Sequence, residues 1–276
     1  MERNFGKWLV ASDIDGTLNS KARKLPHRNK VAIEKFISAG GYFTLASGRP
    51  ISSLERAWKT VETNCAAVAL NGGLIYDFKE HKILKKNSIG KEGQDFVKAV
   101  IKKFGKAPYF IEVGVFGAEN AYIVKKGLMS TCQVVFDRVP HTYQNVDTVP
   151  TDDWCKIIFW GNPLAINKLK KFAKSYPNAG NFMSSSVVSF EMLAPNTHKG
   201  TGVMELAKLL GVDKAHTAAI GDYFNDWDML KTVGFPACAG QAPKAIHNIC
   251  KFEACHCNNG CVAELLDYIM AGKAES

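Results

Sequence analysis

The chain has 276 residues, 46% of them hydrophobic and 22% charged, which is typical of a globular protein. No apolar run approaches the roughly 18 residues that a membrane-spanning helix needs, and the opening MERNFGKWLVAS is too polar for a signal peptide, so we expect a cytoplasmic protein without a membrane partner. The net charge of +9 suits an anionic ligand, but the lysines are spread over helix faces and no arginine-rich or aromatic-basic motif occurs, which argues against nucleic acid.

The eight cysteines do not indicate a disulfide scaffold in a chain of this length. Four of them fall in the segment CKFEACHCNNGC, residues 250–261, together with His256. This segment is either a zinc or redox site or a set of thiols that pack as small apolar side chains. The spacing matches no standard pair of CxxC motifs, which favours packing.

The N-terminal part alternates between strand and helix patterns. The predicted elements are a strand at 8–12, a helix at 28–39, a strand at 42–46, a helix at 50–60 and a strand at 65–70. Gly40 and Gly41 end the first helix, and Pro50 lies in the first turn of the second. Strands that alternate with helices over short connections predict a parallel, doubly wound sheet.

The pattern changes after residue 73. We predict a hairpin in LIYDFKEHKILKK, a helix at 91–104, strands at 109–113 and 121–124, a polar stretch without regular structure, a strand at 156–160, a helix at 164–176, and strands at 181–184 and 187–192. This order predicts an inserted α+β domain at 83–190, with a short sheet covered by two helices.

The first pattern returns after Pro195. The predicted elements are helices at 199–210, 226–232, 243–249 and 261–270 and strands at 217–220, 235–239 and 252–256. An α/β core domain built from residues 1–82 and 191–276 therefore encloses the inserted domain.

Reactive side chains follow four points of the predicted core where a strand ends or a helix begins. These are Asp13 and Asp15 in DIDGT, Ser47 to Arg49 in SGRP, Lys199 in THKG, and Asp222, Asn225 and Asp226 in GDYFND. Taken singly, each stretch could be a turn, a helix cap or a surface charge. The carboxyl ends of parallel strands, however, meet at one edge of a sheet, so we expect these groups to converge.

Converging carboxylates repel one another unless cations neutralise them, and Mg²⁺ suits such oxygen ligands. Lys199 supplies a second positive charge, and the Ser47 hydroxyl and the Gly48 amide can bind an anion at a helix N-terminus. The combination predicts a phosphoryl site. There Asp13 attacks phosphorus, Asp15 serves as general acid and base, Gly16 allows a sharp turn, and Thr17 steadies the loop.

These stretches resemble the motifs of the haloacid-dehalogenase superfamily of phosphatases, in particular its Cof-like branch with a type-IIB cap. The motifs are ASDIDGTL, LASGRP, the lysine of EMLAPNTHKG, and IGDYFNDWDML, in the family's order and with the insertion between the second and the third. The resemblance implies a Rossmann-like core with an inserted type-IIB cap and covers essentially the whole chain.

The resemblance also implies residue roles. Asp13 corresponds to the nucleophile and Asp15 to the general acid and base. The carboxylates of Asp13 and Asp222 and the main-chain carbonyl of Asp15 would hold Mg²⁺. The supporting positions are Asn225 and Asp226 beside the metal, Ser47, Gly48, Thr17 and Lys199 at the phosphate, and Asn71 and Arg49 as candidate substrate contacts. The tail segment CNNGCVAELL has cysteine where the family commonly has an acid, so Asn258 and Asn259 receive no role.

The leading functional prediction is a Mg²⁺-dependent phosphatase for small phosphorylated metabolites such as sugar phosphates. A hexose-phosphate phosphomutase is an alternative, since phosphomannomutases share a similar cap. A non-catalytic sensor of phosphorylated ligands is another, although it would be expected to lose Asp13 or Asp15. Phe116, Glu119, Asn120 and Tyr122 either line the substrate pocket or are ordinary strand and loop residues. The sequence predicts no oligomeric state.

Overall fold

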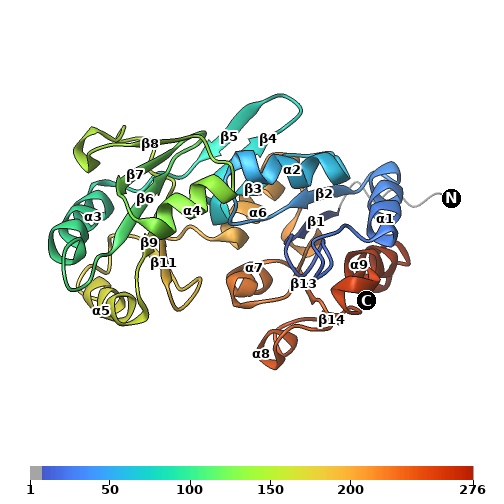
Figure 1. The fold of residues 1–276 in the computed structure, drawn as a ribbon. Coiled ribbons are helices and arrows are strands. Elements are labelled where there is room, and N and C mark those ends of the chain that lie inside the picture. Colours follow the sequence, from blue (N-terminus) through green and yellow to red (C-terminus); the bar gives the residue numbers. More distant parts are fainter. Residues whose placement is uncertain (1–7, 276) are drawn as a thin grey trace. The chain divides into compact units, whose positions relative to one another are not determined.

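The computed structural model of the protein describes residues 8–275 (Figure 1). Within this range the chain forms two compact units. The first consists of the described residues up to Gly48, Glu55–Leu84, and the described residues from His198 onward. The second consists of Arg49–Leu54 and Lys85–Thr197. Each unit has a large sheet of its own.

The sheet of the first unit is fully parallel, with the strand order β14-β13-β12-β1-β2. Its strands are β1 (Leu9–Ser12), β2 (Tyr42–Leu45), β12 (Thr217–Gly221), β13 (Phe235–Cys238) and β14 (Phe252–Glu253). All residues of β1, β12 and β13 are buried, as expected for parallel strands that are covered on both faces.

Helices cover both faces of this sheet (Figure 1). The helices with residues in the first unit are α1 (His27–Ser38), α2 (Ile51–Val61), α6 (Lys199–Leu210), α7 (Trp227–Thr232), α8 (Lys244–His247) and α9 (Cys261–Met270). Leu9 and Ala11 of β1 share an apolar core with residues of α6 and α7, whereas α1 and α9 pack against each other. The predicted doubly wound α/β fold is confirmed.

The second unit has a six-stranded sheet with the order β10-β11-β9-β6-β7-β8, antiparallel except for the pair β7–β8. Its elements are α3 (Lys91–Phe104), β6 (Glu112–Phe116), β7 (Ala121–Lys125), α4 (Leu128–Phe136), β8 (His141–Tyr143), β9 (Lys156–Trp160), α5 (Pro163–Ala173), β10 (Asn181–Met183) and β11 (Ser189–Leu193). Alternate residues of β6 and β9 form one apolar core with α3 and α5.

Three predictions about these elements were wrong. The predicted third strand of the parallel sheet is β3 (Ala67–Ala69), which pairs antiparallel with β4 (Leu74–Asp77) in a separate sheet that also contains β5 (Lys82–Lys86). A single bridge between Ala46 and Val68 joins β3 to the end of β2. The predicted irregular stretch contains α4 and β8, and β6 begins three residues later than predicted.

In the described part of the chain, no helix combines the length and the apolar character needed to cross a membrane.

Candidate active site

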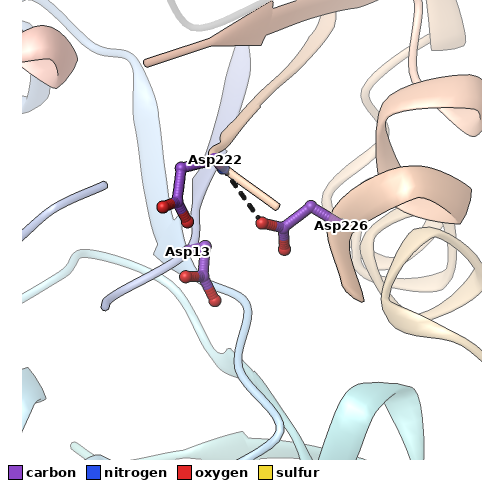
Figure 2. Close-up of side chains that lie close together, drawn as sticks. All are labelled: Asp13, Asp222 and Asp226. Carbon is purple, nitrogen blue, oxygen red and sulfur yellow. Dashed lines mark hydrogen bonds between the residues drawn. The ribbon is translucent and has the colours of Figure 1, made fainter. Parts of the chain in front are cut away.

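Two neighbouring strands of the parallel sheet end in aspartates. Ser12 of β1 lies opposite Ile220 of β12, and the amide of Asp13 donates a hydrogen bond to the Ile220 carbonyl at 3.0 Å. Asp222 directly follows β12, so Asp13 and Asp222 leave the sheet side by side. Asp226 joins them, and one carboxylate oxygen from each of the three lies within 4.8 Å of the others (Figure 2).

The turn after β12 fixes Asp226. Its Oδ2 atom accepts hydrogen bonds from the amides of Asp222 at 3.1 Å and Tyr223 at 3.4 Å. Asp226 is completely buried. The carboxylate therefore closes the turn and holds Asp222 beside the end of β1.

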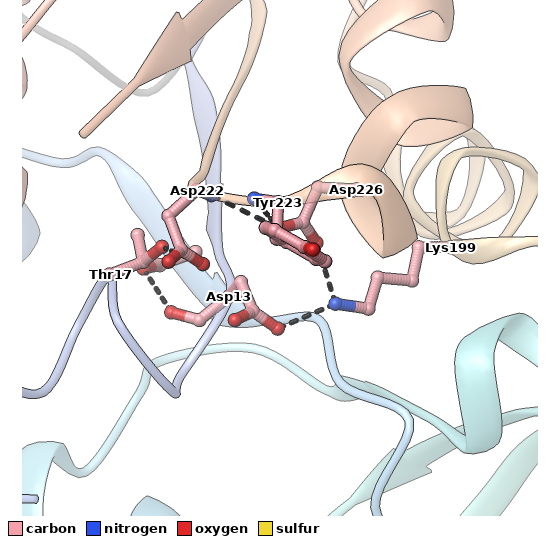
Figure 3. A network of polar contacts seen from close by, with 7 residues as sticks. Asp13, Thr17, Lys199, Asp222, Tyr223 and Asp226 are labelled. Carbon is pink, nitrogen blue, oxygen red and sulfur yellow. Dashed lines mark hydrogen bonds and ion pairs between the residues drawn. The ribbon is translucent and has the colours of Figure 1, made fainter. Parts of the chain in front are cut away.

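Lys199 places a positive charge inside the carboxylate cluster (Figure 3). It is the first residue of α6, and 1% of its surface is exposed. Its Nζ atom lies 2.5 Å from Oδ1 of Asp13 and 2.6 Å from Oδ1 of Asp226. When all four groups are ionised, negative charge still exceeds positive charge at this site.

Burial and the neighbouring charges together shift the pKa values of the cluster. Burial and the Asp226 carboxylate raise the pKa of Asp13 to about 6, against the lowering effect of the Lys199 ammonium. Burial and repulsion from Asp13 also raise the pKa of Asp222 to about 6. Burial lowers the pKa of Lys199, but the Asp13 and Asp226 carboxylates outweigh it and the pKa is raised.

The cluster fits a hard divalent cation. Carboxylate oxygens suit Mg²⁺, which takes one or two protein carboxylates and keeps several waters. Three buried or half-buried carboxylates share a single ammonium, so a divalent cation would supply the positive charge that Lys199 alone does not. In residues 8–275, no other group of three or more His, Cys, Asp or Glu side chains offers ligand atoms this close together.

The raised pKa values predict how metal-free stability depends on pH. A carboxyl whose folded-state pKa lies above its ordinary value, here 3.8 against about 6 for Asp13, contributes stability at low pH and loses it as the pH rises through that interval. The metal-free wild type should therefore lose stability relative to Asp13→Asn as the pH rises from about 4 to about 6.

Urea unfolding in the presence of a chelator measures this difference. At saturating Mg²⁺ the wild type should instead be the more stable of the two proteins, because the cation favours the ionised carboxylates and the amide of Asp13→Asn is a weaker ligand. A difference between the two proteins that does not vary with pH in the chelator would contradict the assignment.

The loop after β1 folds tightly around Asp13. The amide of Leu18 donates to the Asp13 carbonyl at 3.1 Å. Gly16 has a φ of +80°, a conformation that favours glycine, and a Cβ at this position would lie 2.3 Å from Oδ2 of Asp222. Buried Thr17 places its Oγ1 atom 3.5 Å from Oδ1 of Asp222. Gly16 thus lets this loop approach the Asp222 carboxylate.

We predict that Gly16→Ala destabilises the protein and weakens Mg²⁺ binding, since both the φ angle and the contact with Asp222 oppose a side chain. The matched control is Gly211→Ala, where φ is +69° but no atom lies within 4 Å of the new Cβ. In the control, the free energy of unfolding should fall by only about 1 kcal/mol, the cost of placing a side chain at a positive φ. Equal unfolding free energies and equal Mg²⁺ affinities for the two variants would contradict the role of Gly16.

Ser47, Gly48 and Asn71 meet at the end of β2. The Ser47 amide donates to the Val68 carbonyl at 2.9 Å, and the Ser47 carbonyl accepts from the Asn71 amide at 2.9 Å. A Cβ on Gly48 would lie 2.8 Å from Oδ1 of Asn71. Leu70 and Asn71 have φ angles of 51° and 56°, in the left-handed region that asparagine tolerates but leucine seldom adopts. Because β2 neighbours β1, this group lies at the same edge of the sheet as Asp13.

The remaining predicted residues are placed differently. Asp15 and Asn225 are exposed, on the loops that follow β1 and β12. Arg49 belongs to the second compact unit, whereas the carboxylate cluster belongs to the first.

Sequence reasoning missed Gln241. Its Nε2 atom donates to the Gly16 carbonyl at 2.5 Å and lies 3.5 Å from Oδ2 of Asp222. Its Oε1 atom accepts from the Cys257 amide at 3.0 Å. The only signal in the sequence was its position. Gln241 follows the predicted strand at 235–239, which was expected in the same sheet as the strand that precedes Asp222.

The segment with the C-terminal cysteines contacts the loop that follows β1. All eight cysteines are free thiols. The Cys261 thiol donates to the Thr17 carbonyl at 3.2 Å, and the Cys255 amide donates to the Glu264 carboxylate at 2.6 Å. The Cys261 contact joins the segment to the Asp13 loop, whereas the Cys255 contact lies within the C-terminal part of the chain.

The chain belongs to the haloacid dehalogenase-like hydrolase family, whose model matches residues 10–266. This confirms the resemblance seen in the motifs and the prediction that the protein is an enzyme of this class.

Two curated relatives span nearly the whole chain. The putative phosphatase YxeH of Bacillus subtilis (strain 168) is 22% identical over 272 residues, covering 96% of this chain and 99% of its own. The 5-amino-6-(5-phospho-D-ribitylamino)uracil phosphatase YbjI of Escherichia coli (strain K12) is 27% identical over 272 residues, covering 96% of this chain and 97% of its own.

Two solved structures share the fold. A haloacid dehalogenase-like hydrolase from Bacteroides thetaiotaomicron has a TM-score of 0.81 at 17% identity, covering 95% of this chain and 99% of its own. The subclass IIB sugar phosphatase BT4131 has a TM-score of 0.80 at 16% identity, covering 95% and 98%. The predicted core with an inserted type-IIB cap is confirmed as the fold of the chain.

Proposed function

We propose that the protein is a Mg²⁺-dependent phosphatase that hydrolyses phosphate monoesters of small metabolites through an aspartyl-phosphate on Asp13. The carboxylates of Asp13, Asp222 and Asp226 around the buried Lys199 ammonium carry the proposal. The names of the relatives support it: one acts on a phosphorylated ribitylaminouracil, and one structural neighbour is a sugar phosphatase.

In the first step a carboxylate oxygen of Asp13 attacks phosphorus. The bond between phosphorus and the ester oxygen breaks, and exposed Asp15 protonates the departing alkoxide. Lys199, which already contacts Asp13, neutralises negative charge on the phosphoryl oxygens. The Ser47 hydroxyl, the Gly48 amide and Thr17 are the proposed further phosphate contacts.

In the second step water attacks the phosphorus of the aspartyl-phosphate. Asp15, now ionised, removes a proton from that water, and the bond between phosphorus and the Asp13 oxygen breaks. Inorganic phosphate leaves, and the Asp13 carboxylate is restored.

The carboxylates of Asp13 and Asp222 and the main-chain carbonyl of Asp15 would hold Mg²⁺. Asp226 supports them through the amide of Asp222, and Asn225 lies in the same turn. The ion would neutralise the carboxylates and polarise the phosphoryl group. Asn71 and Arg49 are proposed substrate contacts.

Phosphate release from a panel of phosphorylated metabolites, with Mg²⁺ or with a chelator, tests the proposal. We expect release from at least one sugar phosphate or similar monoester, and loss of that release in the chelator. Conversion of a hexose 1-phosphate to its 6-phosphate without phosphate release would replace the phosphatase with a mutase. Binding without turnover would indicate a sensor.

A further inference from the structure

The side chain of Gln241 joins three loops of the first unit. Gln241 lies between β13 and α8. Through its amide group it contacts Gly16 after β1, Asp222 after β12, and Cys257 after β14. The three loops leave three different strands of the parallel sheet.

A glutamine is suited to this position because its amide has both a donor and an acceptor. The NH₂ group has two hydrogens, which can serve the Gly16 carbonyl and the Asp222 carboxylate together, while the oxygen accepts from the Cys257 amide. An ionised carboxylate offers no donor, and a lysine or arginine offers no acceptor.

Two of the contact partners of Gln241, Gly16 and Asp222, lie directly against each other. A Cβ on Gly16 would lie 2.3 Å from Oδ2 of Asp222, the same oxygen that Gln241 approaches. The Asp222 carboxylate is therefore enclosed by Gly16, Thr17 and Gln241, with the Thr17 hydroxyl 3.5 Å from Oδ1. A shift of the Gln241 side chain would release both the Gly16 carbonyl and the carboxylate.

We propose that Gln241 is a positioning residue that holds the Asp222 carboxylate and the Asp13 loop at the separation that a shared Mg²⁺ requires. The proposal rests on the proposed function. Gln241 acts through Asp222 and Gly16, whose positions determine how many oxygens face the ion. Partners that orient metal ligands in this way typically contribute 10- to 100-fold to metal affinity.

The test is Gln241→Met, which keeps the length of the side chain and removes both hydrogen-bonding groups. Mg²⁺ binding is measured by calorimetry without substrate, and the melting temperature is measured in a chelator. The matched control is Gln94→Met, because Gln94 donates to two main-chain carbonyls, those of Ile89 and Thr151, in the other unit.

We expect Gln241→Met to bind Mg²⁺ about 10- to 100-fold more weakly than the wild type and Gln94→Met to bind it as the wild type does. At saturating Mg²⁺ the kcat of Gln241→Met should return towards the wild-type value. If Gln241→Met fails to fold, Gln241→Asn takes its place; its amide is one methylene too short to reach Gly16, so the same loss of affinity is expected.

Wild-type Mg²⁺ affinity in a folded Gln241 variant, or an equal loss of affinity in Gln94→Met, would overturn the proposal. Failure of the proposed function gives a different result: Mg²⁺ affinity would fall in the Gln241 variant although the wild type hydrolyses no phosphate monoester.

Discussion

Asp13→Asn is expected to abolish phosphatase activity while leaving the protein folded. The amide is nearly the same size as the carboxylate and keeps an oxygen that can accept from Lys199, but it is a poor nucleophile and a weaker metal ligand. Loss of a nucleophile in a covalent mechanism lowers kcat by about 10⁴-fold or more. Hydrolysis of p-nitrophenyl phosphate at saturating Mg²⁺ measures the effect.

The matched control is Asp267→Asn. Asp267 is an exposed carboxylate on α9 in the same unit, paired with Arg28 at 3.5 Å. Its substitution should leave activity at the wild-type level. Turnover by Asp13→Asn within tenfold of the wild type would refute the assignment of the nucleophile.

Lys199→Met is expected to reduce both stability and activity. Methionine fills a similar volume but leaves the buried carboxylates of Asp13 and Asp226 without their shared ammonium, which lies 2.5 and 2.6 Å from them. Removing one partner of a buried ion pair typically costs 3–5 kcal/mol, so we expect a loss of about that size in the metal-free protein. The loss of a charge that stabilises the transition state should lower kcat by about 10²- to 10³-fold.

Urea unfolding and steady-state kinetics measure the two effects. Lys208→Met, which removes an exposed lysine from the same helix, is the control and should change neither. Mg²⁺ should recover part of the stability lost in Lys199→Met, since it also neutralises the carboxylates. Unfolding free energies that match those of Lys208→Met would show that Lys199 does not neutralise the cluster.

The sequence predicts the elements that have strong periodicity and clear ends. The helix expected at 199–210 is α6, and Gly211 ends it with a φ of 69°. The helices expected at 91–104 and 261–270 are α3 and α9 with the predicted bounds. In each of them one apolar face is buried, which produces the periodicity.

Helix α4 could not be predicted from its sequence, LMSTCQVVF. Several of its residues have low helix propensity, and the large apolar side chains of Leu128, Val135 and Phe136 are exposed rather than gathered on a buried face. The carboxylate of Glu112 on β6 accepts from the amides of Met129 and Ser130 at the start of the helix. That contact between segments distant in the chain is not visible in a local pattern.

Strand β6 was predicted three residues too early because Gly114 interrupts its apolar run. Glycine weakens a strand pattern, but here a Cβ would lie 2.8 Å from the Trp160 ring, so the glycine makes room for it. The aromatic neighbour comes from β9, far away in the chain.

The part of the candidate site that could be predicted from the sequence is the part that follows from the parallel strands of the core. Asp13 and Asp222 meet because β1 and β12 are parallel neighbours, and Lys199 joins them from the first turn of α6. Gln241 belongs to no motif, and its contacts arise only when three loops are folded together.

The most direct test of the central claim, that Asp13 receives the phosphoryl group, is a burst experiment on Asp15→Asn with p-nitrophenyl phosphate. The p-nitrophenolate leaves without a general acid, so the first step proceeds, whereas the second lacks the base that activates water. We expect a stoichiometric burst of p-nitrophenolate and a phosphoryl group on the peptide that contains Asp13, detected by mass spectrometry. Steady turnover without a burst, with Asp13 unmodified, would contradict the account.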